Sequence, residues 1–83
     1  MKPDKKALIQ EAVTLLKAIA PEIDADTLAP ERPLREQVDL DSMDWLNFLI
    51  SLHQRFQVEI AESDYAQLRS LNNVADYLSA RLP

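Results

Sequence analysis

The sequence predicts an all-α fold: a single domain spanning residues 1–83, with four helices, a long loop between the first and second, and a short third helix. The chain has 83 residues, enough to close one small hydrophobic core. It contains no glycine, which disfavours tight β-hairpins and removes the glycine-rich loops that cradle phosphates. Three segments repeat apolar residues at intervals of three and four, the period of an amphipathic helix.

The first helix should begin at Asp4, whose side chain can cap it, and end before Pro21. Its apolar residues recur at helical spacing: Leu8, Ile9, Ala12, Val13, Leu16 and Ile19. The stretch from Pro21 to Asp41 holds three prolines, so it is predicted to be a long loop. Four apolar residues should anchor this loop to the core: Ile23, Leu28, Leu34 and Val38.

The second helix, predicted from about Ser42 to Phe56, has two apolar stripes where a helix of a small bundle needs one. The stripe expected to face the core consists of Trp45, Phe48, Leu49, Leu52 and Phe56. The other stripe lies on the same side of the helix as Ser42 and consists of Met43, Leu46 and Ile50. We expect this second stripe to remain exposed for a partner protein. Trp45 should also reduce the space between helices, which favours a short group, a polar group or an amino acid beside it over a long apolar chain.

The last third of the chain predicts two more helices. Val58 to Ile60 reads as a short extended connector, after which Ser63 can cap a brief helix that runs to about Leu68. Ser70 can cap the final helix. The apolar residues of that helix again follow the helical period: Leu71, Val74, Ala75, Leu78 and Leu82.

Composition excludes several classes of function. A net charge of -5 argues against nucleic-acid and anionic-membrane partners and favours basic protein surfaces. The chain has no cysteine and one histidine, His53, which lies roughly 16 Å of helical rise from Ser42. We therefore expect no catalytic residue and no metal site, although Glu59, Glu62 and Asp64 could bind a cation loosely if they are not simply solvated. Without an apolar segment long enough for a signal or a membrane span, a cytoplasmic protein is expected.

Ser42 is the strongest candidate for a functional residue. The run Asp39-Leu40-Asp41-Ser42-Met43-Asp44 places a hydroxyl between carboxylates at the point where a loop becomes a helix. Asp41 or Ser42 could simply cap that helix. However, a phosphate held at a helix N-terminus is stabilised by the free amides and by the helix dipole. A serine that lacks catalytic partners in such a position indicates a modification site.

The order of several motifs resembles that of the acyl carrier proteins over nearly the whole chain. The motifs are the Leu40-Asp41-Ser42-Met43 run, the Phe56-Gln57-Val58-Glu59-Ile60 segment, the acidic Glu62-Ser63-Asp64 and the closing Val74-Ala75-Asp76-Tyr77-Leu78. The resemblance implies a four-helix carrier that bears 4'-phosphopantetheine on Ser42, with Asp41 flanking the attachment site. A Mg-dependent phosphopantetheinyl transferase would install this group from coenzyme A. Its thiol would hold acyl or aminoacyl cargo, supplied by a loading ligase and passed to downstream biosynthetic enzymes. A small carrier that visits many enzymes is expected to be a monomer.

Differences from the usual family pattern indicate a specialised carrier. Asp39 and Gln57 stand where the family usually has glycine, and the middle of the second helix is less acidic than in fatty-acid carriers. Partner enzymes are therefore expected to bind a mixed acidic and apolar surface, formed by Asp39, Met43, Asp44, Leu46 and Ile50 with Asp41 beside them. An alternative function is an adaptor that has the carrier fold but is never modified.

Overall fold

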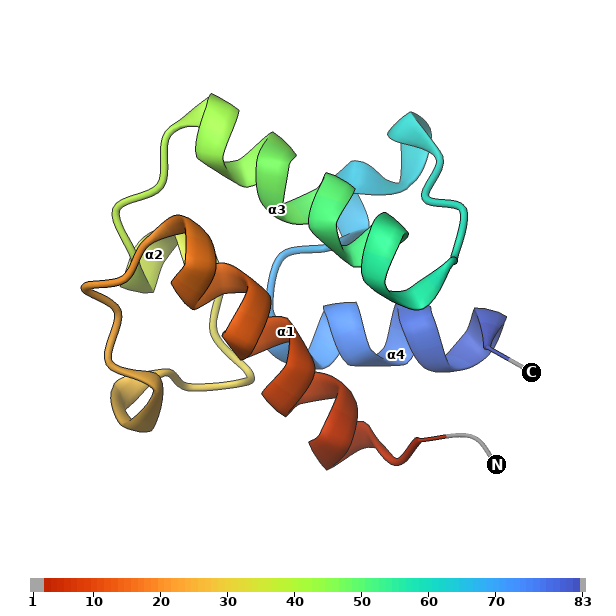
Figure 1. Ribbon diagram of the computed structural model, residues 1–83, viewed down its shortest axis with the longest axis horizontal. Coiled ribbons are helices and arrows are strands. Elements are labelled where there is room, and N and C mark those ends of the chain that lie inside the picture. Colours follow the sequence, from red (N-terminus) through yellow and green to blue (C-terminus); the bar gives the residue numbers. More distant parts are fainter. Residues whose placement is uncertain (1–2, 83) are drawn as a thin grey trace.

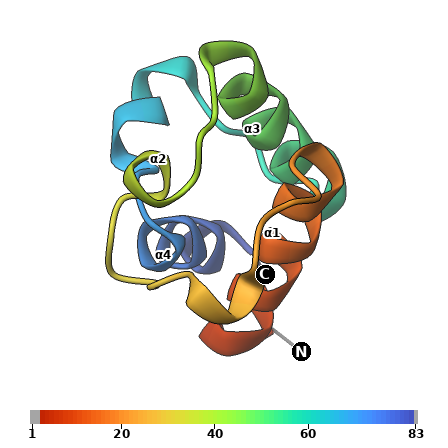
Figure 2. The ribbon, with the colours of Figure 1, turned by 90° about the vertical axis from the view of Figure 1, so that its left-hand side faces the viewer.

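The computed structural model describes residues 3–82, which fold around one hydrophobic core and contain no β-strand (Figure 1). The elements in chain order are α1 (Lys5–Ile19), the 3₁₀ turn η1 (Ala25–Thr27), α2 (Leu34–Gln37), α3 (Ser42–Phe56), the 3₁₀ helix η2 (Glu62–Gln67) and α4 (Leu71–Arg81). Helix α1 packs against both α3 and α4. Figure 2 shows these helices, together with α2 and η2, arranged around the shared interior. The all-α prediction is confirmed.

Local sequence signals account for the ends of α1 and α4. Asp4 caps α1 by accepting a hydrogen bond from the Ala7 amide at 2.8 Å, and the helix ends at Ile19, just before Pro21. Ser70 caps α4 in a reciprocal capping box with Asn73, whose side chain accepts from the Ser70 amide. Both caps are where the sequence predicted them.

The core draws its largest side chains from every part of the chain. Those with almost no exposed surface are Leu8, Leu16, Leu34, Phe48, Leu49, Leu52, Leu68, Leu71, Val74 and Leu78. Of the predicted loop anchors, Ile23, Leu34 and Val38 are buried, and Leu28 is half-buried against the core. The long segment between α1 and α3 is therefore ordered by burial, as expected, although it also contains the short helix α2 that the sequence did not predict.

A single side chain, Gln37, fastens the loop between α1 and α3. Its Oε1 accepts from the Ala29 amide at 2.7 Å, and its Nε2 donates to the carbonyls of Ala29 at 2.9 Å and Arg32 at 3.0 Å. These contacts pair the Ala29 amide and the Arg32 carbonyl, and the Ala29 carbonyl also accepts from the Arg32 amide within the loop. Sequence reasoning missed Gln37, because nothing local distinguishes it from a solvated glutamine.

Backbone hydrogen bonds then join this loop to the start of α4. The Leu34 amide donates to the Arg69 carbonyl at 2.8 Å, and the Asn72 amide donates to the Pro30 carbonyl at 3.0 Å. These two bonds hold the loop against α4 at Pro30 and at Leu34. The segment that leads to α3 therefore starts from a fixed position.

The expectation that Ser63 caps the third helix is wrong. The cap position of η2 is Ala61, which makes no side-chain cap, and Ser63 is an exposed residue inside the helix. A tertiary contact anchors the helix instead: the Tyr77 hydroxyl of α4 donates to Asp64 Oδ2 at 2.7 Å. Arg81 lies 3.7 Å from the same oxygen. Because this anchor comes from a residue 13 positions away, η2 can form without the local cap that the sequence reasoning required.

Candidate functional site

The candidate site lies at the first turn of α3, at the end of the ordered loop. Val38 and Leu40 are buried there while Asp39 and Asp41 are exposed, so the chain alternates between core and solvent as it reaches the helix. This alternation leaves Ser42, the first residue of α3, on the exposed side of the turn. The sequence reasoning did not identify Leu40 as an anchor, although its burial sets the position of the residues that follow.

Asp41 caps α3. Its Oδ1 accepts a hydrogen bond from the Asp44 amide at 2.8 Å. Of the two residues that could have capped the helix, Asp41 therefore performs this role, and the Ser42 hydroxyl makes no hydrogen bond with any residue between 3 and 82. Ser42 is therefore not the residue that caps α3, and its exposed hydroxyl is not needed to start the helix.

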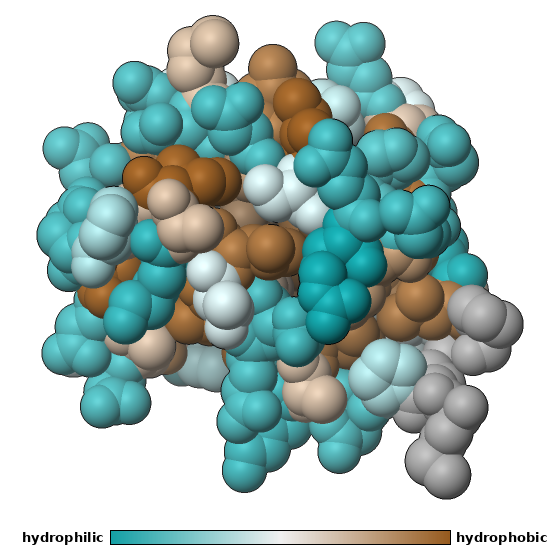
Figure 3. All heavy atoms as spheres, in the orientation of Figure 1, coloured by the Kyte–Doolittle hydropathy of each residue, from teal (hydrophilic) through white to brown (hydrophobic). Residues whose placement is uncertain are grey.

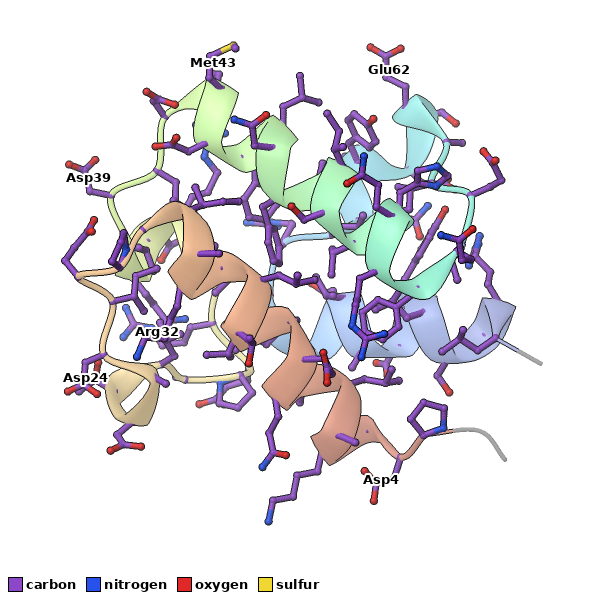
Figure 4. All side chains as sticks on the ribbon, viewed as in Figure 1. Asp4, Asp24, Arg32, Asp39, Met43 and Glu62 are labelled. Atoms are coloured by element: carbon purple, nitrogen blue, oxygen red, sulfur yellow. The ribbon has the colours of Figure 1, made fainter. Side chains whose placement is uncertain are left out.

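The electrostatics of this turn combine opposite contributions. The first amides of a helix have no intrahelical partner, and the helix dipole adds a partial positive charge there. Three carboxylates, those of Asp39, Asp41 and Asp44, surround the same turn. Figure 4 shows Asp39 and Met43 pointing outward on either side of the turn, away from the bundle. A group attached to Ser42 Oγ would therefore extend into solvent between acidic side chains.

The apolar stripe predicted to remain exposed is exposed. Met43 is 67% exposed, Leu46 39% and Ile50 43%, and these are the large apolar side chains that stand out on the surface. We call these three residues the docking stripe. In Figure 3, hydrophobic side chains interrupt the hydrophilic surface over α3. The three side chains therefore place apolar surface beside Ser42.

The opposite side of α3 faces the core as predicted, with Phe48, Leu49 and Leu52 buried. Trp45 is half-buried and packs against Phe48, with ring centroids 5.5 Å apart. Trp45 also lines an open cleft of about 470 Å³ between α2, α3 and η2. Charged side chains, including Arg35 and Arg69, also line that cleft. The surface one turn along α3 from Ser42 therefore combines aromatic and charged side chains.

The end of α3 shows how the chain manages without glycine. Gln57 follows the helix in the left-handed conformation, with φ 57° and ψ 39°. A residue with a side chain pays roughly 1 to 2 kcal/mol for this conformation, which glycine adopts freely. The Gln57 side chain donates to the Gln54 carbonyl at 2.7 Å, and this bond partly offsets the cost.

His53 has a structural contact that the sequence did not reveal. Its ring is exposed, but its Nδ1 lies 2.9 Å from the Val58 carbonyl, across the turn that follows α3. The histidine thus helps to close the connector between α3 and η2. This contact depends on how the chain turns at Gln57, so the sequence alone does not indicate it.

Within residues 3–82, no three His, Cys, Asp or Glu side chains gather where they could share a metal ion. Asp64, one of the three carboxylates considered for a cation, is instead engaged by Tyr77, Gln67 and Arg81. No helix among the described residues is both long enough and apolar enough to span a bilayer.

Comparison with known proteins finds a matching family model and several similar proteins. The family model described as the phosphopantetheine attachment site matches residues 8–78. An acyl carrier protein of Campylobacter jejuni subsp. doylei is 31% identical over 75 residues, covering 90% of this chain and 87% of the relative. An acyl carrier protein of Syntrophus aciditrophicus is 32% identical over 60 residues, covering 72% of this chain and 75% of the relative. One from Thermosynechococcus vestitus is 26% identical over 74 residues, covering 89% and 91%.

Proposed function

The chain belongs to the phosphopantetheine-attachment family of the acyl carrier proteins, and from this premise we propose that Ser42 is the residue that bears the 4'-phosphopantetheine arm. The observation that carries the proposal is the exposed Ser42 hydroxyl at the start of a helix that Asp41 already caps. The bound arm supplies a terminal thiol, which holds an acyl or aminoacyl group as a thioester. A chain with no cysteine has no thiol of its own for this purpose.

The residues at the first turn of α3 fit the attached group. Ser42 Oγ would attack the β-phosphate of coenzyme A, and a partner transferase with Mg²⁺ would accept the hydroxyl proton. A phosphodiester to Ser42 forms as the bond to the adenosine 3',5'-bisphosphate leaving group breaks. The free amides of the first turn then stabilise the anionic phosphodiester, while Asp41 holds those amides in helical geometry.

We propose that the docking stripe and the carboxylates beside it bind the partner enzymes. Met43, Leu46 and Ile50 offer apolar area next to Ser42, and Asp39 and Asp44 offer negative charge that basic enzyme surfaces complement. These partners comprise the phosphopantetheinyl transferase, a ligase that loads the cargo and the biosynthetic enzymes that use it. Each must reach the arm, so a surface adjacent to the attachment residue is the one they share.

Acyl carrier proteins are carriers rather than catalysts, and we propose that this chain, too, catalyses no reaction by itself. Its contribution is to tether the intermediate, which gives that intermediate a high effective concentration at each active site that the arm enters. A monomer in the cytoplasm suits a protein that must dissociate from one enzyme before it visits the next. An unmodified adaptor is not favoured, because the family match is to the attachment site itself.

The proposal is tested by incubating the purified chain with coenzyme A, Mg²⁺ and a broad-specificity phosphopantetheinyl transferase. Mass spectrometry should show the gain of one arm, located by fragmentation on Ser42. Ser42→Ala should abolish the gain, whereas Ser63→Ala, at another exposed serine, should not change it. Circular dichroism should show that both variants are folded, because neither serine caps a helix. A chain that stays unmodified, or that is modified equally well as Ser42→Ala, would refute the assignment.

A further inference from the structure

A second surface, formed without any contribution from α3, has the properties of a binding groove. It is an open groove of about 760 Å³ between α1, the segment 25–30 and the first residues of α4. Figure 1 shows the chain after η1 running back beneath α1 toward the start of α4. The bond from the Asn72 amide to the Pro30 carbonyl fixes the second wall of the groove relative to α4. We call this surface the lysine groove.

Lysines mark both ends of the lysine groove. Lys5 and Lys6 lie at one end of α1 and Lys17 at the other, and all three line the groove. They are all of the lysines between residues 3 and 82, in a chain whose net charge is -5. Asp26, on the other wall, and Asp76, 3.3 Å from the Lys5 ammonium, offset only part of this charge. The charged side chains that line this groove are three lysines and Asp26, so its lining carries a net positive charge on a protein that is acidic as a whole, while the arginines lie elsewhere.

The floor of the lysine groove is apolar. Ile9 and Val13, one turn apart on α1, are half-buried there, with Leu28 opposite them and Leu71 beneath. Because Lys5 and Lys17 are twelve positions apart on one helix, the groove extends for about 18 Å along α1. A groove of about three helical turns, with apolar side chains between lysines at its two ends, is long enough for a short bound helix.

We propose that the lysine groove binds an acidic amphipathic helix of a partner protein. Such a helix would place one apolar stripe of about 12 residues on Ile9, Val13 and Leu28, and carboxylates near its two ends against the lysines. The concave walls favour a helix over an anionic bilayer, which presents a flat surface. Because lysines lie at both ends of the groove, they favour an acidic helix over a small anion, which would contact the lysines of one end only.

This surface goes beyond the carrier function and does not depend on the modification of Ser42. The lysine groove and the docking stripe share no residue. One partner could therefore hold the carrier by the groove while the first turn of α3 stays free for enzymes. Tethering of this kind raises the concentration of the carrier near the enzymes of one assembly.

The test uses the unmodified, isotopically labelled chain and a synthetic capped peptide of about 12 residues, with leucines on one helical face and glutamates at both ends. NMR titration should give saturable binding at micromolar to millimolar peptide, with the largest shifts at Ile9, Val13 and Leu28. A peptide with lysine in place of each glutamate should bind about tenfold more weakly or not at all.

Matched charge reversals identify the contact. Lys6→Glu and Lys17→Glu should each weaken binding of the acidic peptide about tenfold, whereas Arg69→Glu, outside the groove, should change it less than about twofold. Circular dichroism monitors folding, and Lys6→Glu adds a carboxylate to the first turn of α1, where negative charge is favourable. The proposal is overturned if the peptide does not bind, if both peptides bind equally, or if vesicles of anionic phospholipid, and not the peptide, shift the groove residues.

Discussion

Replacement of Gln37 by methionine tests whether one amide side chain orders the loop that positions Ser42. The Gln37→Met side chain has nearly the same length but can form none of the three short hydrogen bonds to Ala29 and Arg32. Each such bond contributes about 1 kcal/mol net, so the free energy of unfolding should fall by about 3 kcal/mol. The free energy of unfolding of a native protein is typically about 5 to 15 kcal/mol, so a loss of this size can be measured directly.

Urea denaturation followed by circular dichroism measures this change, and Gln54→Met is the matched control. Gln54 is exposed on α3, and only its backbone carbonyl is used in a turn contact, so its replacement should change stability by less than about 0.5 kcal/mol. Hydrogen exchange provides a local readout, because the Ala29 amide should be protected in the native chain and exchange faster in Gln37→Met. If Gln37→Met and Gln54→Met cost the same, the loop does not depend on this side chain and the reasoning fails.

Three further predictions concern η2, the docking stripe and the cleft below Ser42. Burial, and then the hydrogen bond to Asp64, raise the pKa of the Tyr77 hydroxyl above 10, so the neutral form contributes stability that is complete below pH 10 and is lost as pH rises through the folded-state pKa. Tyr77→Phe should cost roughly 1.5 to 3 kcal/mol at pH 7 and show a weaker loss of stability above pH 10 in urea titrations; an unchanged alkaline slope would contradict this. Ile50→Asp should lower the kcat/KM of the transferase about tenfold with unchanged helicity, whereas Ala80→Asp, on α4, should not, and equal effects would argue against the docking stripe. A long saturated acyl chain loaded on the arm should leave the NMR shifts of the core residues unchanged, because the Trp45 ring packs against Phe48 and occupies space between the arm and the core; large core shifts would disprove that role.

The elements that the sequence predicted well are those whose signals lie within a few residues. Asp4 and Ser70 accept hydrogen bonds from amides three residues ahead, and the apolar periodicity of α3 separates its buried side from its exposed stripe. A cap and a helical period are both local properties, so they could be read without knowing the fold. The position of Ser42 at a helix start was predictable for the same reason.

The missed or mistaken details depend on residues that are far apart in the chain. The prediction that Ser63 caps η2 failed because Tyr77 anchors Asp64 from another helix. The role of Gln37 was not visible because its partners lie in a loop whose path is set by burial of Leu34 and other anchors. Such contacts have no sequence signature, since any exposed glutamine or tyrosine would look the same.

The sequence by itself determined an all-α carrier-type chain, the order of its four predicted helices and a serine flanked by carboxylates at the start of α3. Only the tertiary structure decided that Asp41 and not Ser42 caps that helix, and that lysines from α1 meet apolar residues from the segment 25–30 and α4 in one groove. Short-range hydrogen bonds and side-chain periodicity act along the chain, whereas a choice between two adjacent caps and the assembly of a surface depend on how the packed core orients each element.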